Sequence, residues 1–345
     1  MMRSDARGWL IGLIAVWLVA VLPQPVLAAE SPVQQQQQRQ ITQPLNNAPV
    51  WREVRSGKSF STTTKGVDTG VLINSSGQTW RAISEGPLWY WGGIVLLVVL
   101  GLIILFYLIR GTIKLKGQLT GRDILRFTDW DRVIHWATAI SFVILAISGL
   151  IMLFGKHLLL SWMGYVAFSW LAVISKTIHN FVGPVFVLCT VLIILTFVRD
   201  NLPRAYDWKW IKTAGGMLGG KEVPSGKFNA GEKAWFWGGV LLLGIIVSVT
   251  GLILDFPNFR QGRDTMQIAH LLHVSAAVIF MAISLGHIYL GTLGIRGTYR
   301  SMRHGTVDET WAKQHHEYWY DEVKARPSAT PGETGGTHPA VQPER

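Results

Sequence analysis

The sequence predicts an all-α integral membrane protein: a four-helix bundle preceded by one extra N-terminal transmembrane helix and a cleavable signal peptide. Of the 345 residues, 49% are hydrophobic and only 15% are charged, whereas an ordinary soluble domain carries about 25% charged residues. Five uncharged stretches each reach the roughly 20 residues that a helix needs to cross the hydrocarbon core. A spanning segment must satisfy its own backbone hydrogen bonds, so we expect helices within 86–109, 133–155, 177–198, 234–254 and 265–295.

Residues 1–29 have the pattern of a signal peptide. Arg3 and Arg7 precede the apolar stretch Trp9–Leu22, which is followed by a small-residue site. This order is typical of a cleaved leader, with an uncleaved anchor helix as the alternative. Residues 30–86 are polar and begin with a Gln-rich tract, so we expect an exported, partly disordered segment.

The rest of the chain divides into an extra transmembrane helix, a cytoplasmic linker, a four-helix domain and a cytoplasmic tail. These parts cover residues 87–109, 110–132, 133–295 and 296–345, and the tail is expected to be disordered after about residue 326. The spans of the four-helix domain are placed at about 133–155, 171–198, 234–254 and 267–295.

The run 157–175 is also uncharged, but we do not count it as a separate span. Its Trp162, Tyr165 and Trp170 are spaced as in an interfacial aromatic belt. We expect a loop and a shallow amphipathic piece leading into the next span. If this run crossed the membrane instead, His179 would change sides.

The net charge of +11, from 32 Lys and Arg against 21 Asp and Glu, would suggest nucleic acid in a soluble protein. In this apolar chain we expect the lipid bilayer as partner, and no nucleic acid. Basic residues are concentrated in 110–132, in 199–233 and after residue 295, while the alternate loops hold two each. By the positive-inside rule the basic connections lie in the cytoplasm, with the mature N-terminus periplasmic and the C-terminus cytoplasmic.

An ionisable residue within a span is costly and points to function. Among the histidines of the predicted spans four stand out: His135, His179, His273 and His287. His273 and His287 share the last span, 14 residues apart, which is a rise of about 21 Å on nearly the same helix face. Depth pairs His179 with His273 on the outer side and His135 with His287 on the inner side.

Neutral imidazoles on two facing helices are the geometry that ligates haem iron in a helix bundle. Glycines that would let a flat macrocycle approach the backbone give weak support: Gly149, Gly183, Gly244, Gly251 and Gly286. A lone histidine in a span is more often a hydrogen-bonded helix contact, but four at two matched depths favour ligands. Bare metal sites are disfavoured because no acidic or thiol ligands join these histidines.

Other histidines and the cysteine limit the alternatives. His270 precedes His273 by three residues, and either could ligate, although the 14-residue spacing favours His273. The single Cys189 excludes a disulfide framework, a cysteine-ligated iron–sulfur cluster and a four-cysteine zinc site. The remaining histidines lie in predicted loops or the tail and are expected to be solvated: His157, His304, His315, His316 and His338.

Four motifs follow one another along the chain, together with His273 and His287 in the last span. They are Asp131-Arg132-Val133-Ile134-His135-Trp136, Ile178-His179-Asn180-Phe181-Val182-Gly183, Lys227-Phe228-Asn229-Ala230-Gly231-Glu232-Lys233 and Trp311-Ala312-Lys313-Gln314-His315-His316-Glu317-Tyr318-Trp319. This ordered set, over about residues 125–325, resembles a known family, the cytochrome b (gamma) subunit of membrane-bound respiratory formate dehydrogenase.

The resemblance implies a dihaem cytochrome b bundle in the bacterial inner membrane, with two haem b groups. His179 and His273 match the ligands of the haem nearer the periplasm, and His135 and His287 those of the haem nearer the cytoplasm. In the family, electrons pass from a catalytic molybdenum or tungsten (alpha) subunit through an iron–sulfur (beta) subunit and the two haems to menaquinone or ubiquinone. The chain is then an electron-transfer subunit of a quinone-reducing complex and no enzyme on its own.

Asn229 and Gly231 match the loop that contacts the quinone beside His287 in the family. From the residues alone, Asn-Ala-Gly is better explained as a helix N-cap and turn. Residues 1–125 depart from the compact family pattern and contain no apparent ligand set. We expect this extension to contact the periplasmic partners.

Two other functions remain open. A cytochrome b subunit of a nickel–iron hydrogenase or thiosulfate-type reductase would share the bundle and the haems. A haem-free transporter or assembly anchor belongs to a different class. It is disfavoured because we find Pro184 in one span but no internal repeat.

Overall fold

The computed structural model describes residues 34, 48–57, 74–213, 215, 223–259 and 261–325. The predicted signal peptide and the predicted disorder after about residue 326 lie outside the described residues. The chain forms two compact units, divided between Ser75 and Ser76. The first contains the short helix α3 (Ala48–Arg55); the second contains all the long apolar helices.

Five helices in the described residues are long and apolar enough to cross a membrane. The first combines α4 (Ser75–Ile83), the π-helical turn η1 (Ser84–Leu88) and α5 (Trp89–Arg110). The turn contains Pro87, which lacks an N–H and would clash in a regular α-helix, so the wider turn accommodates it. The helix therefore begins about three turns before the predicted residue 87, within the segment expected to be polar and partly disordered.

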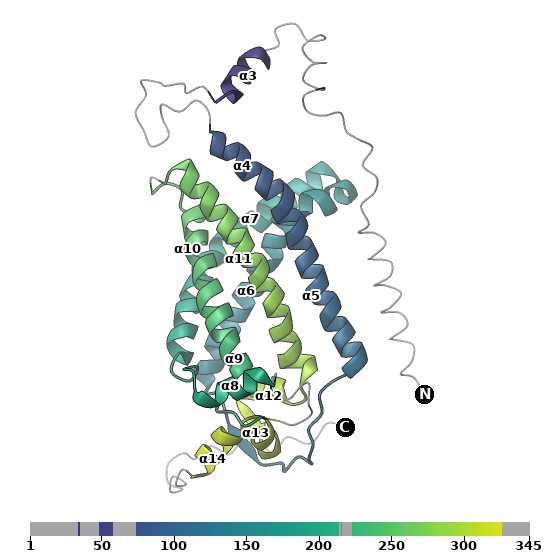
Figure 1. Ribbon diagram of the computed structural model, residues 1–345, viewed down its shortest axis with the longest axis vertical. Coiled ribbons are helices and arrows are strands. Elements are labelled where there is room, and N and C mark those ends of the chain that lie inside the picture. Colours follow the sequence, from purple (N-terminus) through teal and green to yellow (C-terminus); the bar gives the residue numbers. More distant parts are fainter. Residues whose placement is uncertain are drawn as a thin grey trace. The chain divides into compact units, whose positions relative to one another are not determined.

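Helices α6 (Asp129–Leu158) and α7 (Leu160–Phe197) pack against each other along their length (Figure 1). A reciprocal capping box of Thr128 and Asp131 starts α6. The run 157–175 is mostly helical rather than a loop, because α7 continues through it with one break at Gly164. The positive φ of 77° at Gly164 is a conformation that glycine adopts at low cost. Trp162 beside this break is 85% exposed.

The last two spans are also interrupted by π-helical segments. The short helix α8 (Ala205–Lys212) precedes a span made of α9 (Ala230–Ala234), η3 (Trp235–Leu243) and α10 (Gly244–Asp255). The final span consists of α11 (Arg263–Tyr289) and η4 (Leu290–Gly294). We call the end at which α5 and η4 finish the inner end, and the opposite end the outer end.

The bundle core is aromatic and aliphatic, and α5 packs on α11 outside it. One buried cluster joins α7, η3, α10 and α11: Phe186, Leu243, Val247, Ala276 and Phe280. Another lies nearer the inner end: Phe127, Ile134, Ile193, Phe197 and Phe236. Many large apolar side chains on the spans remain exposed, as expected for surfaces that face lipid.

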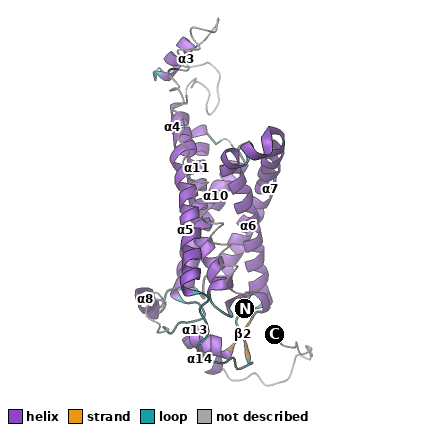
Figure 2. Cartoon of the chain, turned by 90° about the vertical axis from the view of Figure 1, so that its right-hand side faces the viewer, coloured by secondary structure: helices purple, strands orange, loops and turns teal. Residues whose placement is uncertain are grey.

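The predicted linker and tail fold together at the inner end. Strand β1 (Asp123–Leu125) pairs antiparallel with β2 (Thr306–Asp308). Along the chain, β2 lies between the helices α12 (Thr298–His304) and α13 (Glu309–His315). Helix α14 (Glu317–Ala325) completes the group (Figure 2). Its buried core comprises Ile124, Val307, Trp311, Ala312 and Trp319, so these segments form a small packed subdomain.

Candidate haem-binding sites

The outer half of the bundle brings His179 on α7 and His273 on α11 together. Their ring centres lie 6.2 Å apart with an interplanar angle of 75°. The Nδ1 atom of His179 lies 2.9 Å from the Ser148 hydroxyl on α6, and that of His273 lies 3.1 Å from the Thr250 hydroxyl on α10. Neighbouring helices therefore orient both rings.

The two hydroxyls also favour one protonation state of each ring. Ser148 lies within donating distance of the Ile144 carbonyl, and Thr250 of the Ile246 carbonyl. When each hydroxyl donates to its carbonyl, its oxygen accepts from the Nδ1–H of the histidine. This leaves the Nε2 lone pair of both rings available to a metal, the usual arrangement for a ligating histidine.

Two of the five glycines named above lie directly against these rings. A Cβ at Gly149 would lie 3.4 Å from Cε1 of His179, and one at Gly251 would lie 3.2 Å from Cε1 of His273. Gly244 instead approaches the Thr190 methyl group, and Gly183 and Gly286 face open space. Gly149 and Gly251 thus allow the outer imidazoles to lie close to α6 and α10.

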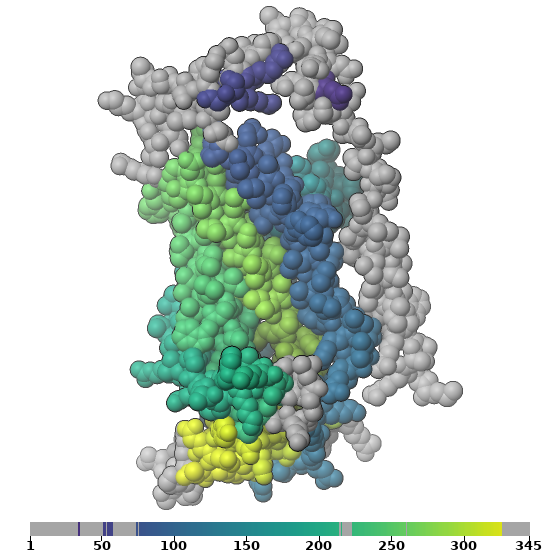
Figure 3. All heavy atoms as spheres, in the orientation of Figure 1, coloured from purple at the N-terminus to yellow at the C-terminus, as the bar shows by residue number. Residues whose placement is uncertain are grey.

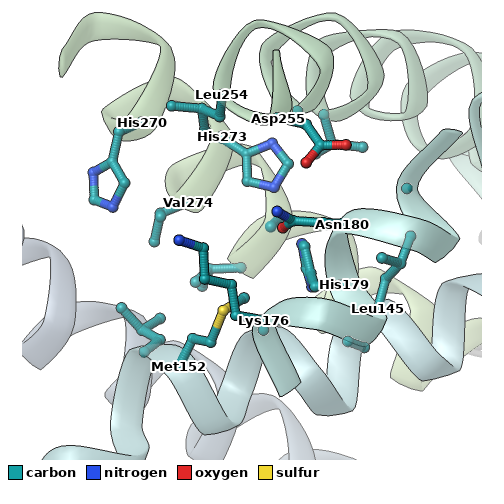
Figure 4. Close-up of a pocket in the computed structure, with 18 of the residues that line it drawn as sticks. Leu145, Met152, Lys176, His179, Asn180, Leu254, Asp255, His270, His273 and Val274 are labelled. Atoms are coloured by element: carbon teal, nitrogen blue, oxygen red, sulfur yellow. The ribbon is translucent and has the colours of Figure 1, made fainter. Parts of the chain in front are cut away.

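The outer histidines line a cavity of about 660 Å³ to which all five spans contribute. This volume lies within the range of about 300–1,000 Å³ that is usual for ligand pockets. Figure 4 shows His179 and His273 projecting from different helices toward each other at its side. The cavity is therefore large enough for an extended organic cofactor beside the histidine pair.

The inner half contains a second pair, His135 on α6 and His287 on α11, with ring centres 6.3 Å apart. Trp235 in η3 stacks on His287, with ring centres 4.8 Å apart and an angle of 15°. The Nδ1 atom of His135 is buried and has no hydrogen-bond partner among the described residues. The four histidines thus form the two pairs that depth predicts.

Both pairs have the spacing of two axial imidazoles. Metal–imidazole nitrogen bonds are about 2 Å long, so imidazoles on opposite sides of one ion have ring centres about 6 Å apart. No cluster of three or more His, Cys, Asp or Glu suited to a metal ion occurs in the described part of the chain. Two ligands suit haem, because the porphyrin supplies the other four nitrogens.

His270 lies apart from the outer pair. Its Nδ1 accepts a hydrogen bond of 3.1 Å from the indole N–H of Trp80 on α4. Figure 4 shows its ring on the opposite side of the cavity from His179. The structure therefore places His273, and not His270, against His179.

Asn229 caps the helix that carries Trp235, as the residues alone suggest. Its side-chain oxygen accepts from the backbone N–H of Glu232, while Glu232 accepts from the backbone N–H of Asn229. A Cβ at Gly231 would lie 2.7 Å from the Trp210 ring. Because Trp235 follows Gly231 by one helical turn, the loop lies beside the histidine pair of the inner half.

A buried ionic network holds this loop against the inner subdomain. Arg126 donates to the Lys227 carbonyl and to Glu232, at 2.8 and 3.0 Å. His316 donates from Nδ1 to the Gly226 carbonyl at 2.7 Å. Its Nε2 lies 4.0 Å from the Glu232 carboxylate. The loop is thereby fixed from both the linker and the tail.

The expectation that His315 and His316 are solvated was wrong. His316 is 1% exposed, and His315 is half-buried. Burial lowers the pKa of His316 to about 3 and that of His315 to about 4, so both are neutral near pH 7. Their burial depends on the packing of α13 and α14 against the loop that contains Asn229. No local sequence pattern predicts that packing.

Several other residues of these sites were missed in the sequence. The Asn229-x-x-Glu232 spacing is a capping-box pattern and could have identified Glu232. Arg126, Trp80 and Trp235 have no comparable signal, because each acts on a segment distant in the chain or on another helix.

Comparison with known proteins agrees with this architecture. Residues 126–305 match the family model of prokaryotic cytochrome b561. The cytochrome b556(fdo) subunit of formate dehydrogenase from Escherichia coli strain K12 is 32% identical over 210 residues, which cover 58% of this chain and 93% of the relative.

Two further relatives have similar names. The nitrate-inducible cytochrome b556(Fdn) subunit of Escherichia coli K12 is 29% identical over 210 residues, covering 59% of this chain and 94% of the relative. The formate dehydrogenase cytochrome b556 subunit of Haemophilus influenzae is 29% identical over 210 residues, covering 58% and 83%. The chain therefore belongs to the prokaryotic cytochrome b561 family and, within it, to the membrane cytochrome b subunits of formate dehydrogenases.

Proposed function

We propose that the chain binds two haem b groups and carries electrons between them across the membrane. The observation that supports this most directly is the pair of bis-histidine arrangements in opposite halves of the bundle, with ring centres 6.2 and 6.3 Å apart. His179 and His273 would hold the outer haem, and His135 and His287 the inner haem.

The haem supplies one-electron redox chemistry when bound, and the protein determines what that chemistry can do. Each haem would be held by two histidines, a ligand set that suits electron transfer rather than oxygen binding. Ser148 and Thr250 orient the outer ligands, and the apolar spans exclude water. The residues do no bond-making chemistry on formate.

We propose that electrons leave the inner haem for a quinone, menaquinone or ubiquinone, at Asn229, Gly231 and His287. The Asn229 side-chain oxygen is used by the helix cap, but no described residue accepts from its amide nitrogen. That nitrogen and the Gly231 N–H at the helix start are donors suited to a quinone oxygen. Trp235 joins this loop to the inner ligand.

The proposed partners rest on the resemblance to the formate dehydrogenase family, and the proposed orientation rests on the distribution of charge. The outer haem would receive electrons from a periplasmic iron–sulfur subunit, itself fed by a catalytic molybdenum or tungsten subunit that oxidises formate. The basic inner end would lie in the cytoplasm of a bacterium and the chain in its inner membrane. Residues 1–29 would be removed as a signal peptide, residues 30–86 exported, and residues 110–132 and 296–345 cytoplasmic.

Haem counting in purified protein tests the proposal. The full chain should carry two b-type haems, His179→Ala or His273→Ala should lose the outer one, and His135→Ala or His287→Ala the inner one. His270→Ala is the matched control within α11 and should retain both. A reduced-minus-oxidised spectrum without b-type bands, or full haem content in His179→Ala, would overturn the assignment.

A hydrogenase or thiosulfate-reductase subunit would give the same spectra. Reduction of the chain's haems by formate in native membranes distinguishes these functions, because it requires a formate-oxidising partner. Reduction by hydrogen alone would favour a hydrogenase partner.

A further inference from the structure

Helices α4 and α5 precede the residues matched by the family model, which begin at Arg126. They nevertheless reach the outer cavity, where Trp80, Ser84, Glu85 and Trp89 form part of its lining. Figure 3 shows the blue atoms of this helix pair lying against the green atoms of α11. The extension thus contributes a wall to the cavity that contains His179 and His273.

Specific contacts hold this wall in place. Ser76 donates to Asp264 at 2.5 Å, and Trp80 donates to His270 at 3.1 Å, both at the outer end of α11. Further along, a Cβ at Gly92 would lie 3.3 Å from the Val278 side chain, so α5 approaches α11 closely. These contacts fix the register of α5 against the bundle.

Trp89 has a buried donor without a partner. Its ring lies 4.4 Å from the His157 ring and 6.2 Å from the Phe154 ring, measured between centres. Its indole N–H is buried and meets no acceptor among the described residues. A buried donor without an acceptor destabilises the fold, so an acceptor supplied by a ligand would stabilise this position.

Two lysines line the same cavity. Lys156 lies near the outer end of α6, and Lys176 lies one turn before His179 on α7. No ion-pair partner of either lysine occurs among the residues that the structure describes. Figure 4 shows the Lys176 side chain extending into the cavity.

Two acidic residues also line the cavity: Glu85, one turn before Trp89, and Asp255 at the end of α10. Glu85 forms an ion pair of 3.1 Å with Arg81, so its charge is compensated. An anionic group would therefore be favoured beside the two lysines and disfavoured beside Asp255.

We propose that Trp89, Lys156 and Lys176 bind the propionate carboxylates of the outer haem, so that the appended helix α5 is part of the cofactor site. This inference rests on the proposed function, because it requires haem in the outer cavity. Two carboxylates match two ammonium groups and one indole donor in charge and hydrogen bonding. The extension would then have a role in the membrane as well as outside it.

The experiment compares variants of the full chain in its native complex. Trp89→Phe removes the N–H and keeps an aromatic ring against His157, while Trp91→Phe is the matched control, because Trp91 is 60% exposed and does not line the cavity. Lys156→Gln and Lys176→Gln remove the two charges at exposed positions. Redox titration followed by absorbance, together with resonance Raman bands of the propionates, is recorded for each variant.

We expect Trp89→Phe, Lys156→Gln and Lys176→Gln each to lower the midpoint potential of the outer haem only. Less compensated propionate charge stabilises ferric iron, which carries one more positive charge than ferrous iron. The propionate bands should shift in the same variants, and Trp91→Phe should match the parent in both measurements.

Unchanged outer-haem potential and propionate bands in all three variants would overturn this inference. If Trp89→Phe disturbs folding, the inner haem will be lost as well, and the two lysine variants then decide. Failure of the proposed function is a separate result, since it appears as full haem content in His179→Ala. Loss of haem in His179→Ala with unaltered Trp89 and lysine variants would reject the propionate site alone.

Discussion

The Thr250 hydroxyl lies 3.1 Å from Nδ1 of His273 and 2.6 Å from the carbonyl of Ile246. With its proton committed to the carbonyl, the hydroxyl accepts from the ring, and the imidazole presents Nε2 to the cavity. A hydrogen-bond acceptor on Nδ1 raises the basicity of a histidine ligand. Ser148 has the same relationship with His179. Helices α6 and α10, which carry neither His179 nor His273, therefore supply the hydrogen bonds that tune the basicity of both histidines.

Replacing Thr250 by Val should raise the midpoint potential of the outer haem. The variant retains the shape of the side chain but removes the acceptor, which makes His273 a weaker donor to ferric iron. One hydrogen bond is worth about 1 kcal/mol, equivalent to about 40 mV for one electron. Redox titration of the purified protein measures the shift.

Thr292→Val is the control for that substitution. Thr292 makes the same bond to the backbone four residues earlier, to Ile288 at 2.6 Å, but is bonded to no histidine. It should leave both potentials unchanged. Equal shifts in the two variants would show that the effect arises from the helix and not from His273.

Gly251→Val should reduce occupancy of the outer haem while the inner haem stays bound. A Cβ at this position already lies 3.2 Å from the His273 ring, and the branched side chain would displace the ligand from the cavity. Gly101→Val is the control, since nothing lies within 4 Å of a Cβ there. Full outer-haem content in Gly251→Val would mean that the ring tolerates displacement.

Two substitutions at Asn229 separate its cap from the proposed quinone contact. Asn229→Ser keeps a capping oxygen but lacks the amide nitrogen, whereas Asn229→Ala loses both and should cost about 1 kcal/mol of stability. If the amide binds quinone, both variants should slow quinone reduction while formate still reduces both haems. Normal quinone kinetics in Asn229→Ser would leave Asn229 as a helix cap only.

The inner subdomain should become less stable as the pH falls below about 6.5. Burial lowers the pKa of His316 from 6.5 to about 3, so between these values the unfolded segment binds a proton that the folded one does not. Arg126 and His315 oppose protonation and Glu232 favours it, with burial the largest effect. The subdomain has its full stability above the pKa that His316 has in the unfolded segment. Below that pH, each pH unit raises the equilibrium constant for opening of the subdomain by at most about tenfold.

Hydrogen exchange of residues 298–325 at pH 7.5 and pH 5, corrected for the intrinsic pH dependence, measures this loss. His316→Gln should remove most of the extra opening at low pH, although it also weakens the resting contact with Gly226. His304→Gln changes an exposed residue and should behave as the parent. A pH response that persists in His316→Gln would assign it to another group, with His315 the next to test.

Each predicted span overlaps one of the five long apolar helices, because the length and apolar composition that a membrane requires are read along the chain. Each span needs about 20 apolar residues, so composition alone located the helices that contain His135, His179, His273 and His287. Boundaries were less accurate, since α7 begins at Leu160 and the first span begins near Ser76. The polar outer turns of α4 are held by contacts with α11, which composition does not report.

Local patterns failed where distant segments meet. Nothing near Asp123 predicts a strand, because β1 exists only through its pairing with β2, 183 residues later. The burial of His316 likewise could not be predicted locally. Its position in a charged tail predicts a solvated side chain, but in the structure it is buried against the Lys227–Glu232 loop.

The sequence by itself determined the class of protein, the depth of each histidine and the pairing that depth allows, because these depend on spacing along helices of fixed rise. Only the tertiary structure decided the rest. It turned His273 rather than His270 toward His179, placed Ser148 and Thr250 against the Nδ1 atoms of the outer pair, and brought α5 to the outer cavity. Those outcomes depend on how neighbouring helices are rotated and packed, and side chains from separate helices meet only when the bundle has formed.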